Sequence, residues 1–430
     1  MKTYEAIVVG AGLSGAVVAR SLAENLDLKV LVLEKRAHLA GNCYDYFDER
    51  DSYIQAYGPH LFHTDSSRVF NYLSRFTQFV SYEHRVQAYL SKKALNDCID
   101  KHRSNPLSAL KGLKELKEDL LMELPFNFNA LEQLFEQAAA QLLEEKLLRI
   151  FGYDKRIPIF KLFSSKDQEL IELAQLIFDL IFKSYTAKQW GVDPSLVDPQ
   201  VLSRVPVLIG RDNRYFPDKY QALPAEGFTK MIESILDHHN IELVLNCDAR
   251  ERMRIHERQL YLDGAACDCA LFYSGALDEF GAKTGGALEY RSVQFSYGEV
   301  EPAYKDSFLS HVFTTLNFPS SEAFTRISKL SLIDPLVLSG KKQSYDALFL
   351  REYPCPYEAN EKDLEPLYPI NDDKNRSLYE SYRDALCSYP HFWPLGRLGT
   401  YRYLDMDDAV LAALDLFDSY CEQKKELTKA

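Results

Sequence analysis

The first residues whose spacing suits a chemical role are three glycines near the start of the chain, Gly10, Gly12 and Gly15. In this G-x-G-x-x-G pattern the first glycine permits a tight turn, the second lets the backbone approach a pyrophosphate, and the third allows close helix packing. The phosphates would lie at the start of that helix, where unpaired backbone N–H groups attract anions. Glu34, which follows the next apolar run, stands where a carboxylate meets a ribose diol. The pattern predicts a dinucleotide site.

The elements around these glycines must hold them in place. Apolar runs at 4–9 and 29–33 predict two strands, and a helix is expected between them at 16–26. The motif therefore has the strand, turn and helix context that a dinucleotide fold requires. Glu34 is followed by Lys35-Arg36 and then by Leu39-Ala40-Gly41-Asn42, a pattern that resembles flavoproteins more than nicotinamide dehydrogenases. We therefore expect FAD rather than NAD.

Composition limits the remaining function classes. No run of about 18 uncharged apolar residues occurs, and Met1-Lys2 leads directly into a strand, so we expect a soluble, cytoplasmic protein without a membrane span. The formal net charge of −13 disfavours nucleic-acid binding, because the protein's own field repels polyanions. The eight cysteines are scattered, with only Cys267 and Cys269 close together. They predict neither a disulfide framework nor a zinc site, and no metal is expected.

Hydrophobic spacing further along the chain indicates three parts. A helical period dominates for about a hundred residues, as in the apolar stripe at 170–181, and predicts an inserted helical domain. Strands at 242–245 and 270–273 are expected to rejoin the nucleotide-binding sheet. Short alternating segments within 287–369 predict an antiparallel sheet, and the last helix, at 406–421, returns to the first part.

The expected fold class is therefore α/β, with a Rossmann-like FAD-binding domain, an inserted helical domain and an antiparallel β-sheet domain. The FAD-binding domain is expected to be discontinuous, and the sheet domain is expected to bind the substrate. The expected boundaries are 1–78, 222–284 and 371–430 for the FAD-binding domain, 91–190 for the helical domain with an extra insertion at 91–123, and 79–90, 191–221 and 285–370 for the sheet domain, which carries a mobile loop near 191–204.

The run at 183–191, KSYTAKQWG, resembles the Y-T-x-K-Q-W-G signature of the UDP-galactopyranose mutases. Further segments resemble this family in the same order along the chain, at 58–64, 84–86, 213–216, 286–292, 324–327, 367–371 and 396–406. The resemblance implies an isomerase that interconverts UDP-galactopyranose and UDP-galactofuranose through a covalent N5 adduct of reduced FAD. It also implies a homodimer, a reductant such as NAD(P)H, and a role in cell-surface polysaccharide biosynthesis.

The resemblance implies roles for particular residues as well. Arg204 and Arg326 match two arginines that neutralise the substrate diphosphate, and His60 and His63 match histidines near the flavin ring, so these four are the catalytic candidates. The residues implied for the cofactor are Gly10, Gly12, Leu13, Ser14, Gly15, Glu34, Lys35, Asn42, His60, Arg397, Asp405 and Met406. The residues implied for the substrate are Phe182, Tyr185, Thr186, Trp190, Arg204, Tyr215, Arg291, Arg326, Tyr368 and Tyr403.

The chain departs from the family pattern in two places. Leu208 stands where the family usually has a second arginine, and residues 91–123 replace a short hairpin connection. Leucines among charged residues at 108–121 predict an exposed amphipathic helix in this insertion. The insertion is either an inert surface elaboration or a contact for an oligomer or a partner glycosyltransferase. The segment 191–203 is either a lid over the substrate or a plain linker.

Several alternatives stay open. The substrate is UDP-galactose or a related nucleotide sugar such as UDP-N-acetylgalactosamine. A redox flavoenzyme of the amine-oxidase type shares the opening motif but gives no reason for Arg204, Arg326 and the 183–191 run. A noncatalytic nucleotide-sugar binder gives no reason for the flavin motifs. Phe182 either supports the uracil or packs in the core, and Arg291 serves either the substrate or the sheet.

Overall fold

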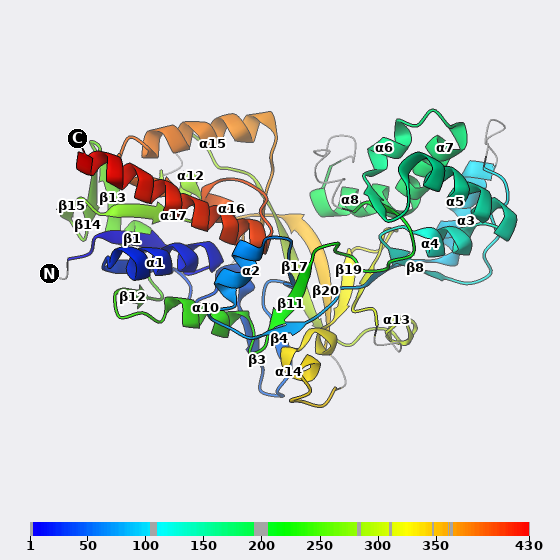
Figure 1. Ribbon diagram of the computed structural model, residues 1–430, viewed down its shortest axis with the longest axis horizontal. Helices are drawn as coiled ribbons and strands as arrows, with labels where there is room; N and C mark the ends of the chain where they lie inside the picture. Colours follow the sequence, from blue (N-terminus) through cyan, green and yellow to red (C-terminus); the bar gives the residue numbers. More distant parts are fainter. Residues whose placement is uncertain are drawn as a thin grey trace.

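The computed structural model describes residues 3–103, 110–192, 205–281, 285–308, 312–345, 348–359, 361 and 364–429. A five-stranded sheet, in the order β12-β2-β1-β16-β22, lies at one end of the molecule (Figure 1). Its neighbouring strands all run parallel. The strands are β1 (Ala6–Val9), β2 (Val30–Leu33), β12 (Ile241–Val244), β16 (Ala270–Tyr273) and β22 (Phe392–Pro394). The strands expected at 242–245 and 270–273 thus join the nucleotide-binding sheet, as predicted.

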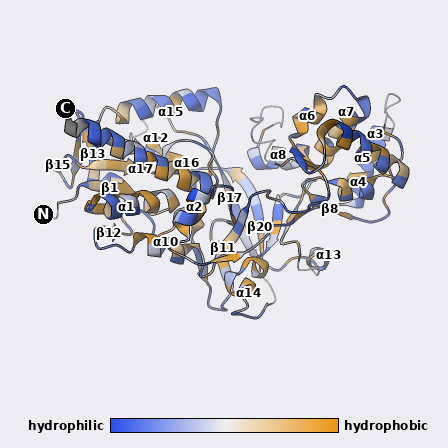
Figure 2. Cartoon of the chain, viewed as in Figure 1, coloured by the Kyte–Doolittle hydropathy of each residue, from blue (hydrophilic) through white to orange (hydrophobic). Residues whose placement is uncertain are grey.

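Both faces of this sheet are buried. Val8 and Phe272 pack into one hydrophobic core, whereas Ile7 and Leu271, the alternate residues of the same strands, pack into another. Parallel strands that are apolar at every position are typical of a sheet covered by helices on both faces. The covering helices are α1 (Leu13–Leu26), α10 (Phe228–Leu236) and α17 (Met406–Lys429) on the first face and α15 (Asp373–Leu386) on the second. Figure 2 shows α1 as largely hydrophobic, which agrees with its buried position.

A seven-stranded sheet, in the order β21-β17-β20-β19-β18-β7-β8, lies in the middle of the molecule (Figure 1). Its strands are β7 (Val86–Leu90), β8 (Leu120–Leu124), β17 (Tyr290–Gly298), β18 (Thr315–Asn317), β19 (Arg326–Lys329), β20 (Phe349–Pro356) and β21 (Tyr368–Pro369). Neighbours run antiparallel except β7 and β18, which run parallel. The predicted antiparallel sheet therefore has one parallel pair, which the long connection between these two strands permits.

The helical domain occupies the other end of the molecule (Figure 1). Its helices are α3 (Lys92–Arg103), α4 (Phe128–Leu134), α5 (Gln137–Phe151), α6 (Ile159–Phe163), α7 (Gln168–Ile177), the π-helical turn η2 (Phe178–Phe182) and α8 (Lys183–Trp190). The paired strands β9 (Lys155–Ile157) and β10 (Val207–Ile209) pack into the same core. Two expected boundaries therefore change, because β10 belongs with the helical domain and β8 belongs with the large sheet.

The amphipathic helix expected at 108–121 is wrong. The described helix of the insertion is α3, residues 120–124 form β8, and residues 104–109 lie outside the described ranges. Leu110 and Leu113 are each 7% exposed and join the core of the helical domain, where Leu113 forms an antiparallel bridge with Phe135. The leucine stripe is buried in extended chain because the neighbouring helices offer it an apolar surface that solvent does not.

Shorter elements connect these parts. The short strands are β3 (Asp45–Phe47) with β4 (Tyr53–Gln55), β5 (Phe62–Thr64) with β11 (Tyr220–Pro224) and β6 (Phe79–Ser81), and β13 (Met253–His256) with β14 (Gln259–Leu262) and β15 (Ala265–Cys267). The short helices are η1 (Gly41–Cys43), α2 (Ser67–Leu73), α11 (Ala249–Arg252), α12 (Leu277–Phe280), α13 (Pro302–Asp306), η4 (Leu330–Ile333), α14 (Pro335–Leu338) and α16 (Gly396–Gly399). Among the helices of the described ranges, none has the length and apolar character needed to span a membrane.

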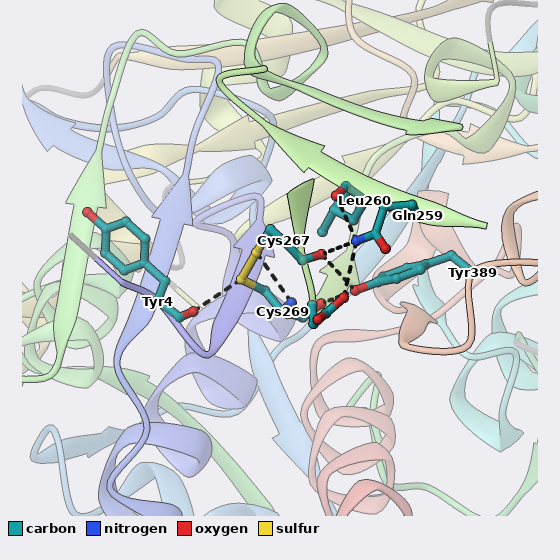
Figure 3. Close-up of a disulfide and its surroundings, with 7 residues drawn as sticks. Tyr4, Gln259, Leu260, Cys267, Cys269 and Tyr389 are labelled. Atoms are coloured by element: carbon teal, nitrogen blue, oxygen red, sulfur yellow. Dashed lines mark hydrogen bonds between the residues drawn. A yellow bond between two sulfur atoms is a disulfide. The ribbon is translucent and has the colours of Figure 1, made fainter. Parts of the chain in front are cut away.

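Cys267 and Cys269 form a disulfide at the step from β15 to β16 (Figure 3). The Cys269 sulfur lies 3.1 Å from the Tyr4 carbonyl oxygen, and the Tyr389 hydroxyl donates to the Cys269 carbonyl at 2.7 Å. Because the bond joins positions only two residues apart, it constrains the unfolded chain little. The sequence did not predict this pair, which is a local link and not part of a disulfide framework.

Candidate active site

A cleft of about 1290 Å³, including its open mouth, lies at the carboxyl ends of β1, β2 and β16, and we call it the nucleotide cleft. Val9, Leu33 and Tyr273, the last residues of these strands, line it. This edge of a parallel sheet is where doubly wound folds bind their ligands. Every residue assigned to the cofactor from the sequence lines this cleft, namely Gly10, Gly12, Leu13, Ser14, Gly15, Glu34, Lys35, Asn42, His60, Arg397, Asp405 and Met406.

Bare backbone forms the part of the cleft next to α1. A Cβ atom at Gly10, whose φ is +97°, would lie 2.1 Å from Ser274 Oγ, and one at Gly15 would lie 2.0 Å from the Gly10 carbonyl oxygen. Neither position accepts a side chain. The start of α1, at Gly12, has no side-chain cap and lines the cleft, so its backbone N–H groups are available to an anion. A pyrophosphate fits this arrangement, and FAD carries one. The described residues contain no group of three or more His, Cys, Asp and Glu that could hold a metal ion.

Glu34 supports the turn that carries the glycines. It is 5% exposed, and its carboxylate accepts hydrogen bonds from the backbone N–H groups of Ala11 at 2.8 Å and Arg36 at 2.9 Å. These bonds tie the end of β2 to the turn after β1. The contact between Glu34 and a ribose that the sequence implies stays a prediction.

Arg36 is a cleft residue that the sequence did not predict. Its guanidinium lies over the Tyr57 ring at 4.5 Å, donates to Asn42 Oδ1 at 3.1 Å, and pairs with Glu365 at 2.8 Å. Burial lowers the pKa of Arg36, but Glu365, Tyr57 and Glu34 together raise it, so the net shift is upward and the side chain remains a cation. Its local sequence does not distinguish Arg36 from Lys35, because Tyr57 and Glu365 come from distant segments.

His60 lines the nucleotide cleft, and its Nδ1 lies 2.8 Å from the Gly58 carbonyl oxygen. Burial lowers the pKa of His60 to about 4, so the ring is neutral near pH 7. Because a carbonyl oxygen only accepts, we assign the single ring proton to Nδ1. His60 therefore offers Nε2 as a hydrogen-bond acceptor.

His63 has different surroundings and is not among the residues that line the cleft. Its ring stacks on Phe216, with 3.7 Å between the ring centres, and its Nδ1 lies 3.2 Å from an Asp218 carboxylate oxygen. Burial lowers the pKa of His63, but Asp218, together with Asp405 and Asp407, raises it, so the net shift is upward. The two histidines predicted as a pair thus differ: the pKa of His60 is lowered and His60 lines the cleft, whereas the pKa of His63 is raised and His63 does not line it.

A second cavity, of about 550 Å³, lies between α8 and the large sheet, and we call it the aromatic cavity. Ala88 of β7, Leu124 of β8 and Asn317 of β18 form its sheet side. Five of the residues predicted for the substrate line it, namely Phe182, Tyr185, Thr186, Trp190 and Tyr215. Asn317 and Pro319 were missed, because no sequence motif marks the short strand β18 that ends at Asn317 or the loop that follows it with Pro319.

The π-helical turn η2 leads the chain into α8 and ends at Phe182. Phe182 is 5% exposed, belongs to the core of the helical domain and also lines the aromatic cavity. Core packing and cavity lining, which the sequence presented as alternatives, therefore occur together. Turns of π-helix are frequent at functional sites because they change which side chains a helix presents.

Arg326, the first residue of β19, has 31% of its side chain exposed and interacts electrostatically with Tyr185, which lines the aromatic cavity. Its Nε lies 3.4 Å from an oxygen of Glu352, which is 5% exposed. Burial lowers the pKa of Arg326, but Glu352 and then Tyr185 raise it, and the net pKa lies well above its usual value. Burial raises the pKa of the Tyr185 hydroxyl to about 12, so that group stays protonated and can donate. A permanent cation beside a neutral hydroxyl suits an anionic ligand.

Tyr368 and Tyr403 lie between the two hollows. Their rings stack with centres 5.6 Å apart, and the Arg397 guanidinium lies 5.3 Å from the Tyr368 ring centre and 5.0 Å from that of Tyr403. Arg397 lines the nucleotide cleft, and Trp190, which lines the aromatic cavity, has its ring centre 6.4 Å from that of Tyr368. The predicted cofactor residues and substrate residues thus meet at Tyr368.

Arg291 and Arg326, the two described arginines predicted for the substrate, are not among the residues that line the aromatic cavity. Arg204 lies outside the described residues, as does most of the expected lid, at 193–204. Arg291, on β17, is 6% exposed, and its guanidinium donates to the carbonyl oxygens of Gln189 at 3.0 Å and Lys188 at 3.1 Å. Arg291 therefore caps the last turn of α8, where helix carbonyls lack partners. The observed contacts of Arg291 support the end of α8, a role that differs from the expected one in the sheet, and its role toward the substrate stays a prediction.

Comparisons with known proteins agree with this arrangement. The family described as UDP-galactopyranose mutase matches residues 180–403, and the NAD(P)-binding Rossmann-like domain matches residues 8–76. A probable UDP-galactopyranose mutase of Klebsiella pneumoniae is 31% identical over 422 residues, which cover 98% of this chain and 95% of that protein. A dTDP-fucopyranose mutase of Escherichia coli is 27% identical and covers 98% of this chain and 99% of its own. The crystal structure of a reduced UDP-galactopyranose mutase shares the fold, with a TM-score of 0.59, 14% identity and coverage of 98% and 95%.

Proposed function

The chain belongs to the UDP-galactopyranose mutase family, and on that premise we propose that it interconverts UDP-galactopyranose and UDP-galactofuranose with bound, reduced FAD. The observation that carries the proposal is that Tyr368 contacts one lining residue of each hollow, Arg397 of the nucleotide cleft and Trp190 of the aromatic cavity. One hollow offers bare backbone that fits a pyrophosphate, and the other offers aromatic walls beside the buried cation of Arg326. Such a pair suits a flavin nucleotide that faces a second nucleotide.

Arg326 is the residue that we propose for the substrate diphosphate. Its guanidinium can form two parallel, charge-assisted hydrogen bonds to phosphate oxygens, which an ammonium group cannot. The cation is fixed in place before the reaction, so it can stabilise the negative charge that develops on departing UDP. Arg204, the second arginine implied for the diphosphate, remains a prediction because it lies outside the described residues.

The residues next to the cofactor are proposed to position it and to control protons. When bound and reduced, FAD would supply the nucleophile, at N5, that displaces UDP from the sugar. His60 presents its unprotonated Nε2 to the cleft and can accept a proton or a hydrogen bond there. Tyr185 keeps its hydroxyl proton and can donate to a phosphate or sugar oxygen.

Further properties are proposed on family membership alone. These are a homodimer, a cytoplasmic place of action, NAD(P)H as the source of reducing equivalents, and a role in making galactofuranose for a cell-surface polysaccharide. A second candidate substrate is a nucleotide sugar other than UDP-galactose, which the full-length likeness to the dTDP-fucopyranose mutase favours. A redox flavoenzyme of the amine-oxidase type would not require Arg326 beside the aromatic cavity.

A direct assay separates these candidates. Purified, FAD-loaded protein is incubated with UDP-galactofuranose, with and without dithionite, and the nucleotide sugars are separated by chromatography. We expect UDP-galactopyranose to form only under reducing conditions. Parallel reactions contain dTDP-fucopyranose or UDP-N-acetylgalactosamine in place of UDP-galactofuranose. Preferential conversion of one of these would assign the second candidate, and conversion of no nucleotide sugar by reduced protein would contradict the mutase proposal.

A further inference from the structure

Lys188 lies on the helix that forms one wall of the aromatic cavity, but its side chain makes contacts elsewhere. Tyr185, Thr186 and Trp190 of α8 line the cavity. The Lys188 ammonium instead donates to three backbone carbonyl oxygens, at 2.6 Å to Phe318, 3.0 Å to Glu322 and 2.9 Å to Phe324. These carbonyls belong to the loop between β18 and β19, the connection loop, which spans 318–325.

The three contacts use the full donor capacity of the side chain. An ammonium group has three N–H bonds and no acceptor, so three carbonyls satisfy it completely. Carbonyls that turn inward need such a partner, because unpaired polar groups away from water are costly. Burial lowers the pKa of Lys188 to about 8, with Glu322 opposing the shift, so the amine stays mostly protonated near pH 7. Lys188 therefore joins α8 to the interior of the connection loop.

The connection loop joins two residues of the site. Asn317, at its start, and Pro319, within it, line the aromatic cavity opposite α8. Arg326 follows its end directly, and Asn317 and Arg326 face each other in the β18–β19 pairing. The Phe318 N–H donates to the Thr325 carbonyl at 2.8 Å, which closes the loop at its base. A shift of this loop would move the cavity wall and the cation together.

Arg291 holds the same helix from a different strand. It donates to the main-chain carbonyl of Lys188, while the Lys188 ammonium holds the connection loop. The end of α8 is thus attached to β17 through one cation and to the β18–β19 connection through another. Neither Lys188 nor Arg291 lines the aromatic cavity among the described residues.

We propose that Lys188 is a positioning residue, which sets the distance between α8 and the connection loop and thereby places Arg326 for the diphosphate. The substrate part of this inference rests on the proposed function, whereas the structural part does not. Lys188 does not touch the reacting groups. Its loss should therefore weaken nucleotide binding without release of the flavin.

The test compares three variants with the wild-type protein, all loaded with FAD. Lys188→Met removes the ammonium and keeps the length, Lys188→Arg keeps a cation with several donors, and Lys183→Met changes an exposed lysine of the same helix as a matched control. Hydrogen exchange of 318–325 is measured without substrate. We expect faster exchange there in Lys188→Met, partial return toward the wild-type rate in Lys188→Arg, and no change in Lys183→Met.

UDP binding by calorimetry and steady-state kinetics supply the functional readout. We expect Lys188→Met to raise the Kd for UDP and the KM about tenfold or more, with a smaller change in kcat and with flavin content unchanged. Lys188→Arg should recover part of this loss. Unchanged exchange and unchanged UDP binding in Lys188→Met would overturn the inference, as would equal loss of flavin and activity in both Lys188 variants. If the exchange result holds but the wild type converts no nucleotide sugar, the proposed function fails and the attachment of the loop by Lys188 stands.

Discussion

Tyr368 contacts one lining residue of the nucleotide cleft and one of the aromatic cavity, yet different parts of the polypeptide build the two hollows. Next to α1 the cleft is backbone from one short segment, and Gly10 and Gly15 leave no room for a side chain. The aromatic cavity and its cation are side chains that arrive from separate segments, such as Tyr185 on α8 and Arg326 on β19. The nucleotide cleft depends on glycines that lack a side chain, whereas the aromatic cavity depends on particular side chains.

This difference predicts which substitutions impair each hollow. A backbone site is lost when any atom is added, because the phosphate needs the space and the N–H groups at once. A side-chain site loses charge or shape one group at a time, and the remaining groups keep their places if their supports are intact. Substitutions in the cleft should therefore abolish cofactor binding, whereas substitutions in the cavity should reduce turnover and leave the flavin bound.

The largest effect is expected for Gly15→Ala. The new Cβ would lie 2.0 Å from the Gly10 carbonyl oxygen, so the turn must move away from the pyrophosphate position. We expect loss of bound flavin, seen as loss of yellow absorbance after gel filtration, and a fall in turnover of at least about 100-fold. Gly298→Ala is the control, because nothing lies within 4 Å of a Cβ placed there. Normal flavin content in Gly15→Ala would contradict the claim that the nucleotide cleft cannot accept an added atom.

Arg326→Ala should act on the other side of the comparison, because it should reduce turnover and leave the flavin bound. Removal of a fixed cation from a developing negative charge is expected to lower kcat by about 100- to 1000-fold, as for loss of one preorganised donor. The flavin spectrum and flavin content should match those of the wild type. Arg376→Ala, at a residue whose side chain is 51% exposed on α15, serves as the control. If Arg326→Ala released the flavin, Arg326 would belong to the cleft instead.

Arg291→Met tests whether this arginine supports α8 or binds substrate. The change leaves the carbonyls of Lys188 and Gln189 without their donors, so we expect the free energy of unfolding to fall by about 1–3 kcal/mol. We expect only a small rise in KM, caused by the loss of support at the end of α8. Thermal unfolding and kinetics are measured beside Arg383→Met, an exposed-site control. An unchanged Tm together with a large rise in KM would restore Arg291 as a direct substrate ligand.

The smallest effect concerns the two histidines. In NMR titrations we expect His60 to stay neutral down to a pKa of about 4 and His63 to titrate above its usual pKa. Asp218→Asn should lower the pKa of His63 because it removes the partner carboxylate. An unchanged His63 titration in Asp218→Asn would show that their 3.2 Å contact carries no charge coupling.

The interaction of His63 with Asp218 should stabilise the fold only within a limited range of pH. A raised His63 pKa stabilises the fold below the unfolded histidine pKa, and this contribution disappears as pH rises through the folded value. For Asp218, burial raises the pKa and His63 lowers it by more, so its contribution disappears as pH falls. The Tm difference between wild type and Asp218→Asn should therefore be largest at pH values between about 4 and 6.5, the usual pKa values of the two groups. Asp384→Asn, at an exposed site, should show no such window.

The cofactor side of the site was predictable because it is local in sequence. The segment from Gly10 to Glu34 contains a strand, a turn, a helix and a second strand, so spacing alone places its residues at one edge of the sheet. Family resemblance supplied the distant members, including Arg397 and Asp405, and the structure brings them to the same cleft. Whether each of them contacts FAD stays a prediction.

Other features depend on packing that spacing does not reveal. Arg36 contacts Tyr57 and Glu365, and Arg291 donates to carbonyls of α8; in both cases the partners are distant in sequence. Residues 108–121 show leucines at helical spacing, yet the described part of this segment is extended, because tertiary burial overrides local periodicity. The contacts of Lys188 could likewise not be predicted from the sequence, although this lysine belongs to the 183–191 motif that carried the family resemblance.

The most direct test of the central claim is the number of sugars converted per reducing equivalent. The FAD-loaded protein is reduced with dithionite under anaerobic conditions, the excess dithionite is removed by gel filtration, and excess UDP-galactofuranose is added. We predict many turnovers for each reduced flavin, with the flavin still reduced at the end, because the reaction has no net redox change. Formation of no more than one product per reduced flavin, or equal turnover with oxidised flavin, would contradict the account.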